Sequence, residues 1–135
     1  KEKYEQGYVI LLDRYTTSSL IYQSSLIEDE KEKLKFMNFV EDYEYMKLNI
    51  KKPDMVIFLT ADYDVILNMR QKRADNDGVL NDVYERNETL MKKIYDNSIF
   101  VAKNSGFIVV KCDENGKMKS IDDIQSEIRS LIKNI

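Results

Sequence analysis

The chain has 135 residues, a third of them charged, and its net charge at neutral pH is -3. This balance of 21 Lys and Arg against 24 Asp and Glu gives no electrostatic reason to expect a nucleic-acid polymer as partner, although a local arginine cluster could bind a small phosphorylated ligand. The absence of histidine excludes Ser-His-Asp triads and His-ligated metal sites.

The same composition sets the expected compartment and size. Cys112 is the single cysteine and cannot form an internal disulfide, which fits a reducing cytoplasm. No apolar run reaches the length of a membrane span, and no signal-peptide pattern opens the chain. We expect one domain over residues 1–135. The sequence begins without Met, so we expect it to be part of a longer protein.

Three short runs predict buried strands, "YVILL" (8–12), "MVIFL" (55–59) and "FIVV" (107–110). Each is apolar on consecutive residues and rich in Val, Ile or Phe, a pattern typical of parallel strands that are covered on both faces.

Segments with helical spacing of apolar residues separate these runs. Helices are predicted over residues 16–27, 30–49, 64–73, 81–104 and 121–134. Strands that alternate with helices indicate an α/β fold, a parallel sheet with helices on both faces. Because three strands make a thin sheet, we expect the later part of a larger α/β domain, incomplete at the N-terminus.

Asp13 and Arg14 follow the first predicted strand directly. In open α/β sheets ligands bind beyond the carboxyl ends of the strands. There a carboxylate can hold a Mg²⁺-bound water, and a guanidinium offers a planar fork of donors to phosphate oxygens. The alternative is a surface ion pair that ends the strand, and the dipeptide alone leaves both interpretations open.

The helix that follows carries polar side chains on one face. Ser19, Tyr22 and Gln23 have the spacing i, i+3 and i+4, and Ser18 lies in the same first turn. A hydroxyl, an aromatic ring and a carboxamide suit contacts to a base and its sugar. Helix capping and a tyrosine at the edge of the core are the alternative.

Three segments together resemble the thymidylate kinase family. "DRYTTSSLIYQSSLI" resembles its Asp-Arg segment with the Ser-rich helix that ends in Tyr-Gln, and "KPDMVIFLTADYDVIL" resembles its Pro-Asp strand. The segment "NDVYERNETLMKKIYDNSIFVAKNSGFIVVKC" is similar to its lid-to-helix region and last strand. The resemblance runs from about Tyr8 to the C-terminus.

The resemblance implies a P-loop kinase fold and transfer of the γ-phosphoryl group of ATP to thymidine monophosphate, with Mg²⁺. It implies that Asp13 lies near the Mg²⁺ shell and that Arg14 binds the acceptor phosphate. Ser18, Ser19, Tyr22 and Gln23 are then expected to contact the nucleoside.

A second site follows from the lid region, about residues 70–85, which closes over the phosphates in similar enzymes. Arg73 is the first candidate for the lid arginine and Arg70 the second. The segment reads Asp82-Val83-Tyr84-Glu85 where Asp-Arg commonly precedes the Glu, so Tyr84 is expected to face the nucleotide.

The phosphate-binding signature G-x-x-x-x-G-K-[ST] does not occur in the 135 residues. In the family this loop follows the first strand, so we expect it N-terminal to residue 1, in a parent chain, and expect these residues alone to be inactive. Two alternatives remain: another nucleoside monophosphate kinase, or a non-catalytic nucleotide-binding or dimerisation module.

The resemblance also implies a homodimer that associates through helices. Residues 20–48 carry more apolar side chains than one helix pair needs, including aromatic residues and methionines, which are enriched at interfaces. We therefore expect a two-fold dimer through this region, with burial inside one subunit as the alternative.

Overall fold

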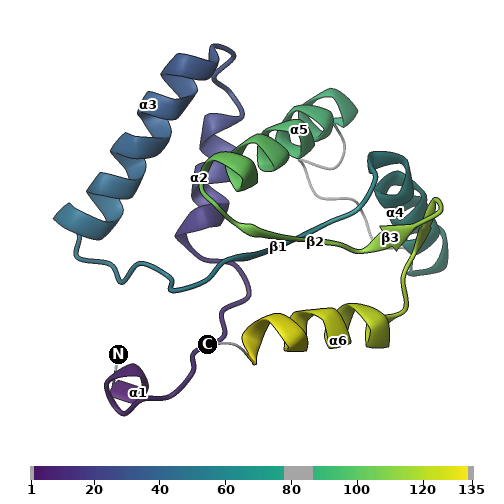
Figure 1. Ribbon diagram of the computed structural model, residues 1–135. Helices are drawn as coiled ribbons and strands as arrows, with labels where there is room; N and C mark the ends of the chain where they lie inside the picture. Colours follow the sequence, from purple (N-terminus) through teal and green to yellow (C-terminus); the bar gives the residue numbers. More distant parts are fainter. Residues whose placement is uncertain (1, 78–86, 134–135) are drawn as a thin grey trace. The chain divides into compact units, whose positions relative to one another are not determined.

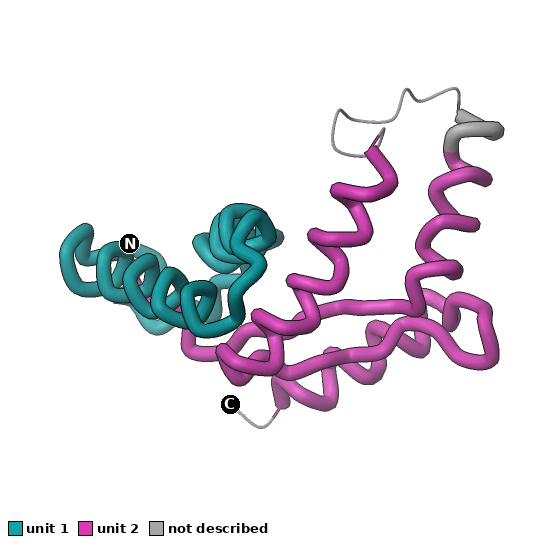
Figure 2. Tube along the Cα trace, turned by 90° about the horizontal axis from the view of Figure 1, so that it is seen from above, with its two compact units in different colours: residues 1–50 teal, residues 51–135 magenta. Residues whose placement is uncertain are grey.

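The computed structural model describes residues 2–77 and 87–133, which belong to two compact units. Unit 1 comprises residues 1–50 and unit 2 comprises residues 51–135 (Figure 2). Among the described residues, none of the helices combines the length and the apolar composition that a membrane span requires.

Unit 1 is helical in its described part. Its elements are α1 (Glu2–Glu5), α2 (Thr16–Ser24), α3 (Glu30–Glu41) and the π-helix η1 (Asp42–Lys47). Asp29 caps α3, because its side chain accepts a hydrogen bond from the backbone N–H of Glu32 at 2.9 Å. Helices α2 and α3 contact one another, and Leu20 on α2 is buried, as are Met37 and Val40 on α3.

The helix predicted over 30–49 changes its winding instead of ending at α3. From Asp42 the backbone continues as a π-helix to Lys47, and the N–H of Leu48 donates to the carbonyl of Tyr43 at 2.9 Å. A π-helical turn is rare and is often found at functional sites. The predicted helix over 16–27 is shorter than expected and ends at Ser24.

The strand predicted over 8–12 is wrong. These residues form no strand, and their side chains are exposed, Val9 to 84% and Leu11 to 83%. An apolar run becomes a strand only when a neighbouring strand supplies the partners for its N–H and C=O groups. In the described part of the chain this segment has no such ladder.

Unit 2 contains the sheet. Its elements are β1 (Ile57–Thr60), α4 (Tyr63–Asp77), α5 (Glu88–Asn104), β2 (Ile108–Lys111), β3 (Asp113–Glu114), β4 (Lys117–Met118) and α6 (Ile121–Ile132). Strands β1 and β2 pair in parallel, from Ile57 opposite Ile108 to Thr60 opposite Lys111. Figure 1 shows α5 and α6 on opposite sides of this pair. The predicted parallel pairing of two strands with helices on both faces is therefore confirmed, each strand beginning one or two residues later than expected.

Local sequence signals explain the helix starts in unit 2. The side chain of Asn87 accepts from the N–H of Leu90 at 3.0 Å and so caps α5. Ser120 does the same for α6, because its hydroxyl oxygen accepts from the N–H of Asp123 at 3.1 Å. These caps satisfy N–H groups that have no acceptor within the helix.

A small antiparallel hairpin, β3 with β4, follows β2. Asn115 and Gly116 form its turn with φ angles of 52° and 75°. Two successive residues with positive φ are the geometry of the tight turns that suit a twisted hairpin, and Asn-Gly is the preferred pair there. This hairpin redirects the chain from the end of β2 into α6.

The core of unit 2 lies between the sheet and its helices. Val101 on α5 and Val110 on β2 are almost inaccessible, and Ala61, Val65 and Ile94 are also buried.

We predict that Val110→Ala lowers the free energy of unfolding by about 2 kcal/mol, because two buried methyl groups are lost and a small cavity is left. Val109→Ala is the matched control, since Val109 is 52% exposed and Val110 only 1%. Its expected loss is below about 1 kcal/mol. Urea unfolding of both variants measures the difference, and equal losses would contradict the assigned core.

Candidate functional site

Asp13 and Arg14 lie in a bend that leads into α2, and both side chains are exposed. Arg14 has a φ of 66°, which is the left-handed region of backbone conformation. An arginine in this region costs free energy, because its Cβ approaches the following carbonyl oxygen. The bend therefore presents the two charged side chains at the start of the helix.

Arg14 differs from the other left-handed residues. In the part of the chain that the structure describes, the non-glycine residues with positive φ are Arg14, Asn49 and Asn115. Asparagine tolerates this conformation, because its short polar side chain can hydrogen-bond locally. Arginine has no such local compensation, and strained residues of this kind concentrate at functional sites.

Helix α2 divides its residues between two faces. Ser19, Tyr22 and Gln23 are exposed, while Leu20 and Ser24 are buried. The prediction that Ser19, Tyr22 and Gln23 share one face of the helix is therefore confirmed. Ser18 is half-buried in the same turn. Asp13 and Arg14 thus directly precede the helix that carries these four polar residues, which extend from its first turn to its C-terminal end.

The first turn of α2 is held by η1. The hydroxyl groups of Thr16 and Tyr45 are 2.9 Å apart and share a hydrogen bond. Burial raises the pKa of Glu44 above its ordinary value, and a hydrogen bond from Thr16 opposes that shift. Burial raises the pKa of Tyr45 as well, so its hydroxyl stays protonated at neutral pH. These contacts tie Thr16, in the first turn of α2, to the π-helix.

The lid candidates belong to unit 2. Arg70 and Arg73 lie on α4, one half-buried and the other exposed, with the spacing i and i+3 of one helical face. Tyr84 lies outside the described residues.

The residues present fit a Mg²⁺ ion bound together with a nucleotide. Within the described ranges, no three His, Cys, Asp or Glu side chains are grouped so that they could hold a metal ion by themselves. Mg²⁺ is usually held by one or two carboxylates together with waters and substrate phosphates. Asp13, an exposed carboxylate beside Arg14, suits that role.

Sequence reasoning missed a charged cluster at the carboxyl ends of both strands. The ammonium of Lys111 lies 3.1 Å from a carboxylate oxygen of Asp62 and 3.7 Å from one of Asp113. The hydrogen bond to Asp62 and the two negative charges raise the pKa of Lys111. The signal in the sequence was an Asp shortly after each strand, the position that ligand sites use in parallel sheets.

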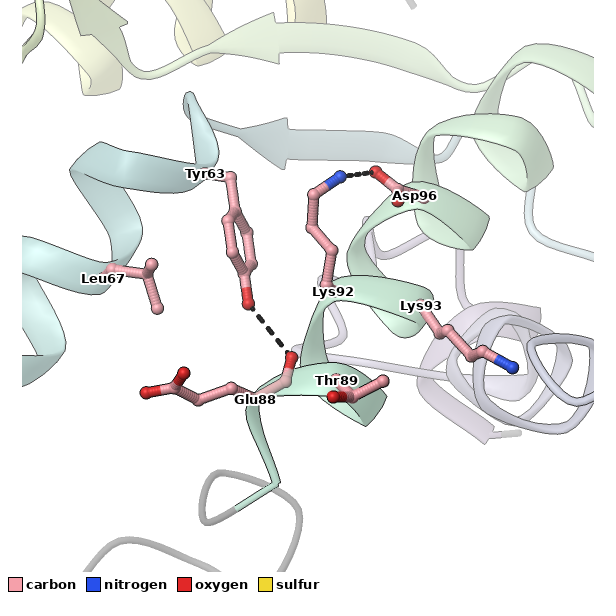
Figure 3. Close-up of a pocket in the computed structure, with 7 residues that line it drawn as sticks. All are labelled: Tyr63, Leu67, Glu88, Thr89, Lys92, Lys93 and Asp96. Carbon is pink, nitrogen blue, oxygen red and sulfur yellow. Dashed lines mark hydrogen bonds and ion pairs between the residues drawn. The ribbon is translucent and has the colours of Figure 1, made fainter.

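A shallow cleft of about 430 Å³ lies between α4 and α5 (Figure 3). The ammonium of Lys92 lies 5.5 Å from the ring centre of Tyr63 and 5.6 Å from that of Tyr95, and it pairs with Asp96. The hydroxyl of Tyr63 donates to the carbonyl of Glu88 at 3.4 Å. These contacts fasten the first turns of α4 and α5 to one another, and the cleft is lined by none of the predicted site residues.

Cys112 is buried at the end of β2, and burial raises the pKa of its thiol. A raised pKa lowers the thiolate fraction at neutral pH, and the thiolate is the reactive form. This environment therefore suits an unreactive buried thiol.

Comparison with known proteins identifies the family. The thymidylate kinase family profile matches residues 1–128. A thymidylate kinase from Caldicellulosiruptor saccharolyticus is 24% identical over 131 residues, which cover 97% of this chain and 57% of that protein. The chain thus spans little more than half the length of this curated relative. No solved structure matches the chain significantly.

Proposed function

The chain belongs to the thymidylate kinase family, and from this membership we propose that the protein that carries it transfers the γ-phosphoryl group of ATP to thymidine monophosphate. The products are dTDP and ADP. The observation that carries the proposal is the left-handed Arg14 beside Asp13, at the start of a helix whose exposed face bears Ser19, Tyr22 and Gln23. The family implies a P-loop kinase fold in which both units form one domain, and the parallel pairing of β1 with β2 supports that fold.

Arg14 holds the acceptor phosphate in this mechanism. An oxygen of that phosphate attacks the γ-phosphorus of ATP, the bond between this phosphorus and the bridging oxygen breaks, and ADP leaves with the electron pair. The reaction needs positioning and charge neutralisation rather than a covalent enzyme intermediate. A guanidinium forms two parallel, charge-assisted hydrogen bonds to a phosphate, so it supplies both.

The exposed face of α2 binds the nucleoside. Gln23 carries both a donor and an acceptor and can pair with the edge of thymine, whereas Tyr22 offers a ring for stacking. Ser18 and Ser19 supply hydroxyl groups at the start of the same face. Recognition by hydrogen bonds discriminates strongly, because a wrong base leaves a polar group unpaired.

The lid region, about residues 70–85, contacts the phosphoryl donor ATP in this proposal. We assign Arg73, and Arg70 as second candidate, to the phosphates of ATP, with Tyr84 facing the nucleotide. The exposed position of Arg73 on α4 supports the assignment. When bound with ATP, Mg²⁺ neutralises phosphate charge, and Asp13 would contact its water shell.

The segment of residues 8–12 supports the need for a further strand. Tyr8, Val9, Ile10, Leu11 and Leu12 are all exposed. Exposed apolar runs of this kind mark surfaces that another part of a protein covers. We propose that the first strand of the kinase fold, with the phosphate-binding loop after it, covers this segment in the active protein.

We also propose that the protein is cytoplasmic. Cys112, the single cysteine of these 135 residues, is buried as a free thiol. Proteins of a reducing compartment typically keep their cysteines in this state.

A homodimer is the proposed assembly, through a surface that we call the α3 stripe, made of Phe39, Tyr43 and Met46. These residues are exposed, Met46 to 77%; Phe39 and Tyr43 have the spacing i and i+4, and Met46 lies in the π-helix η1 that continues α3. The rings of Phe39 and Tyr43 are stacked with their centres 6.1 Å apart. Exposed aromatic residues and methionine are typical of interface cores, and a two-fold axis would pair the stripe with itself.

The first test compares two proteins. A chain that adds the phosphate-binding segment N-terminal to residue 1 should phosphorylate thymidine monophosphate with ATP and Mg²⁺ in a coupled assay for ADP release. The 135 residues alone should not, because the amides and lysine that hold the β- and γ-phosphates are absent from them. Turnover by the short chain would contradict this division of the site.

The second test separates phosphate from base recognition in the longer chain. Arg14→Ala should lower kcat/KM, because the charge-assisted hydrogen bonds to phosphate are lost. The expected loss of transition-state stabilisation is about 2–4 kcal/mol. Gln23→Ala should lose less activity but accept other pyrimidine nucleotides more readily. Lys31→Ala, an exposed residue of α3, is the matched control and should leave both parameters unchanged. Small and equal effects of Arg14→Ala and Gln23→Ala would contradict the proposed roles and indicate that these residues are structural.

The third test concerns the α3 stripe. Sedimentation of the longer chain at micromolar concentration should report twice its mass, and Met46→Glu should give the monomer, because two carboxylates would be buried against one another. Lys31→Glu, on the charged part of α3, should leave the dimer intact. A monomeric parent protein would exclude the proposed assembly.

A further inference from the structure

Asp113 is a buried carboxylate that is used by none of the steps described above. It follows β2, is only 3% exposed, and accepts a hydrogen bond from the backbone N–H of Asp62 at 3.1 Å. The two residues are 51 positions apart in the sequence. This contact therefore joins the segment after β2 to the segment after β1.

The contact replaces a rung of the parallel ladder. The N–H of Cys112 donates to the carbonyl of Thr60 at 2.7 Å, which continues the pairing past the end of β2. In a regular parallel ladder the next donor, the N–H of Asp62, would meet the carbonyl of Cys112. That carbonyl instead accepts from the N–H of Lys119 at 2.8 Å, and the acceptor for the N–H of Asp62 is the Asp113 side chain.

Asp62 directly precedes α4. Its carbonyl accepts from the N–H of Ile66 at 3.1 Å, the first bond of the helical pattern. The neighbouring carbonyl, that of Ala61, accepts from the hydroxyl of Tyr95 on α5 at 3.0 Å. The turn between β1 and α4 is therefore held from two directions, by Asp113 beyond β2 and by Tyr95 on α5.

The charge of Asp113 is only loosely compensated. One of its carboxylate oxygens is inaccessible to solvent and makes no hydrogen bond within the described residues. The ammonium of Lys111 lies 3.7 Å from this oxygen and closer to Asp62. A buried carboxylate with an incomplete set of partners costs stability. The place of this carboxylate beside the start of α4 indicates that it fixes the position of that helix.

We propose that Asp113 is a positioning residue that anchors the start of α4 and thereby sets the direction of the helix that carries Arg70 and Arg73. The catalytic consequence rests on the proposed kinase function, whereas the anchor itself does not. A helix of 15 residues is about 22 Å long. A tilt of about 10° at its first residue would displace the far end by about 4 Å, and much smaller errors of placement already slow catalysis.

Amide hydrogen exchange in the full chain tests the anchor without any assay of activity. In the unsubstituted protein the N–H of Asp62 should exchange about 100-fold more slowly than those of Tyr63 and Asp64, which have no acceptor inside the helix. Asp113→Ala should abolish this protection. Asp113→Asn should preserve most of it, since the amide oxygen can still accept. Glu114→Ala, the exposed neighbour, is the matched control and should change nothing.

The measurement on the unsubstituted protein decides the question even if Asp113→Ala does not fold. Fast exchange at Asp62 there would overturn the anchor. Protection that survives Asp113→Ala would overturn it as well, because another group would then hold the amide.

Kinetics of the phosphate-loop-containing chain test the consequence. Asp113→Ala should lower kcat/KM about 10- to 100-fold. The same change should cost only about 2-fold in a background where Arg70 and Arg73 are both Ala, because the groups that the anchor positions are then gone. A purely structural role would give the same loss in both backgrounds and would overturn the positioning claim. A double-Ala background as active as the parent would overturn it too, while the exchange data would still decide the anchor.

Discussion

The parallel pairing of β1 with β2 is the constraint from which the arrangement of unit 2 follows. Parallel strands cannot be joined by a tight turn, so the chain between Thr60 and Ile108 must cross over the sheet, and it does so through α4 and α5. The same pairing places the carboxyl ends of both strands at one edge. Side chains that are far apart in the sequence, Asp62 and Asp113, therefore meet there.

The two units differ in how they place their polar side chains. At the sheet edge, Asp113 is buried and its carboxylate is committed to the backbone. On α2, the polar face stays in solvent while Leu20 and Ser24 pack inward. A buried group of this kind can fix geometry but is not accessible to substrate, whereas an exposed one can bind a ligand. The former suits a support for α4 and the latter suits direct contact with a nucleotide.

How much of this arrangement the sequence could predict depends on the range of the interactions. Helix starts are local, and Ser120 shows how a single side chain caps the turn that follows it. The shared face of Ser19, Tyr22 and Gln23 is equally local, since helical geometry alone determines it. The Asn115-Gly116 turn is local as well, because Asn-Gly is the preferred pair for a two-residue hairpin turn. By contrast, the anchor at Asp113 depends on strand register across 51 residues, which no local pattern specifies. The strand prediction for residues 8–12 was wrong for the same reason. Composition predicts that these residues are buried, but a strand forms only beside another strand that pairs with it.

Arg14 shows how backbone conformation and chemistry combine in unit 1. A left-handed φ of 66° would suit glycine, which has no Cβ, and asparagine occupies the two comparable positions among the described residues. Either substitution at position 14 would relieve strain of about 1 kcal/mol, yet either would remove the guanidinium. Binding a phosphate through a bidentate, charge-assisted pair is worth more than that, since hydrogen bonds to charged groups contribute about 1.5–3 kcal/mol each. In the proposed function, phosphate binding would therefore offset the strain at position 14, whereas burial does not, because the side chain is exposed.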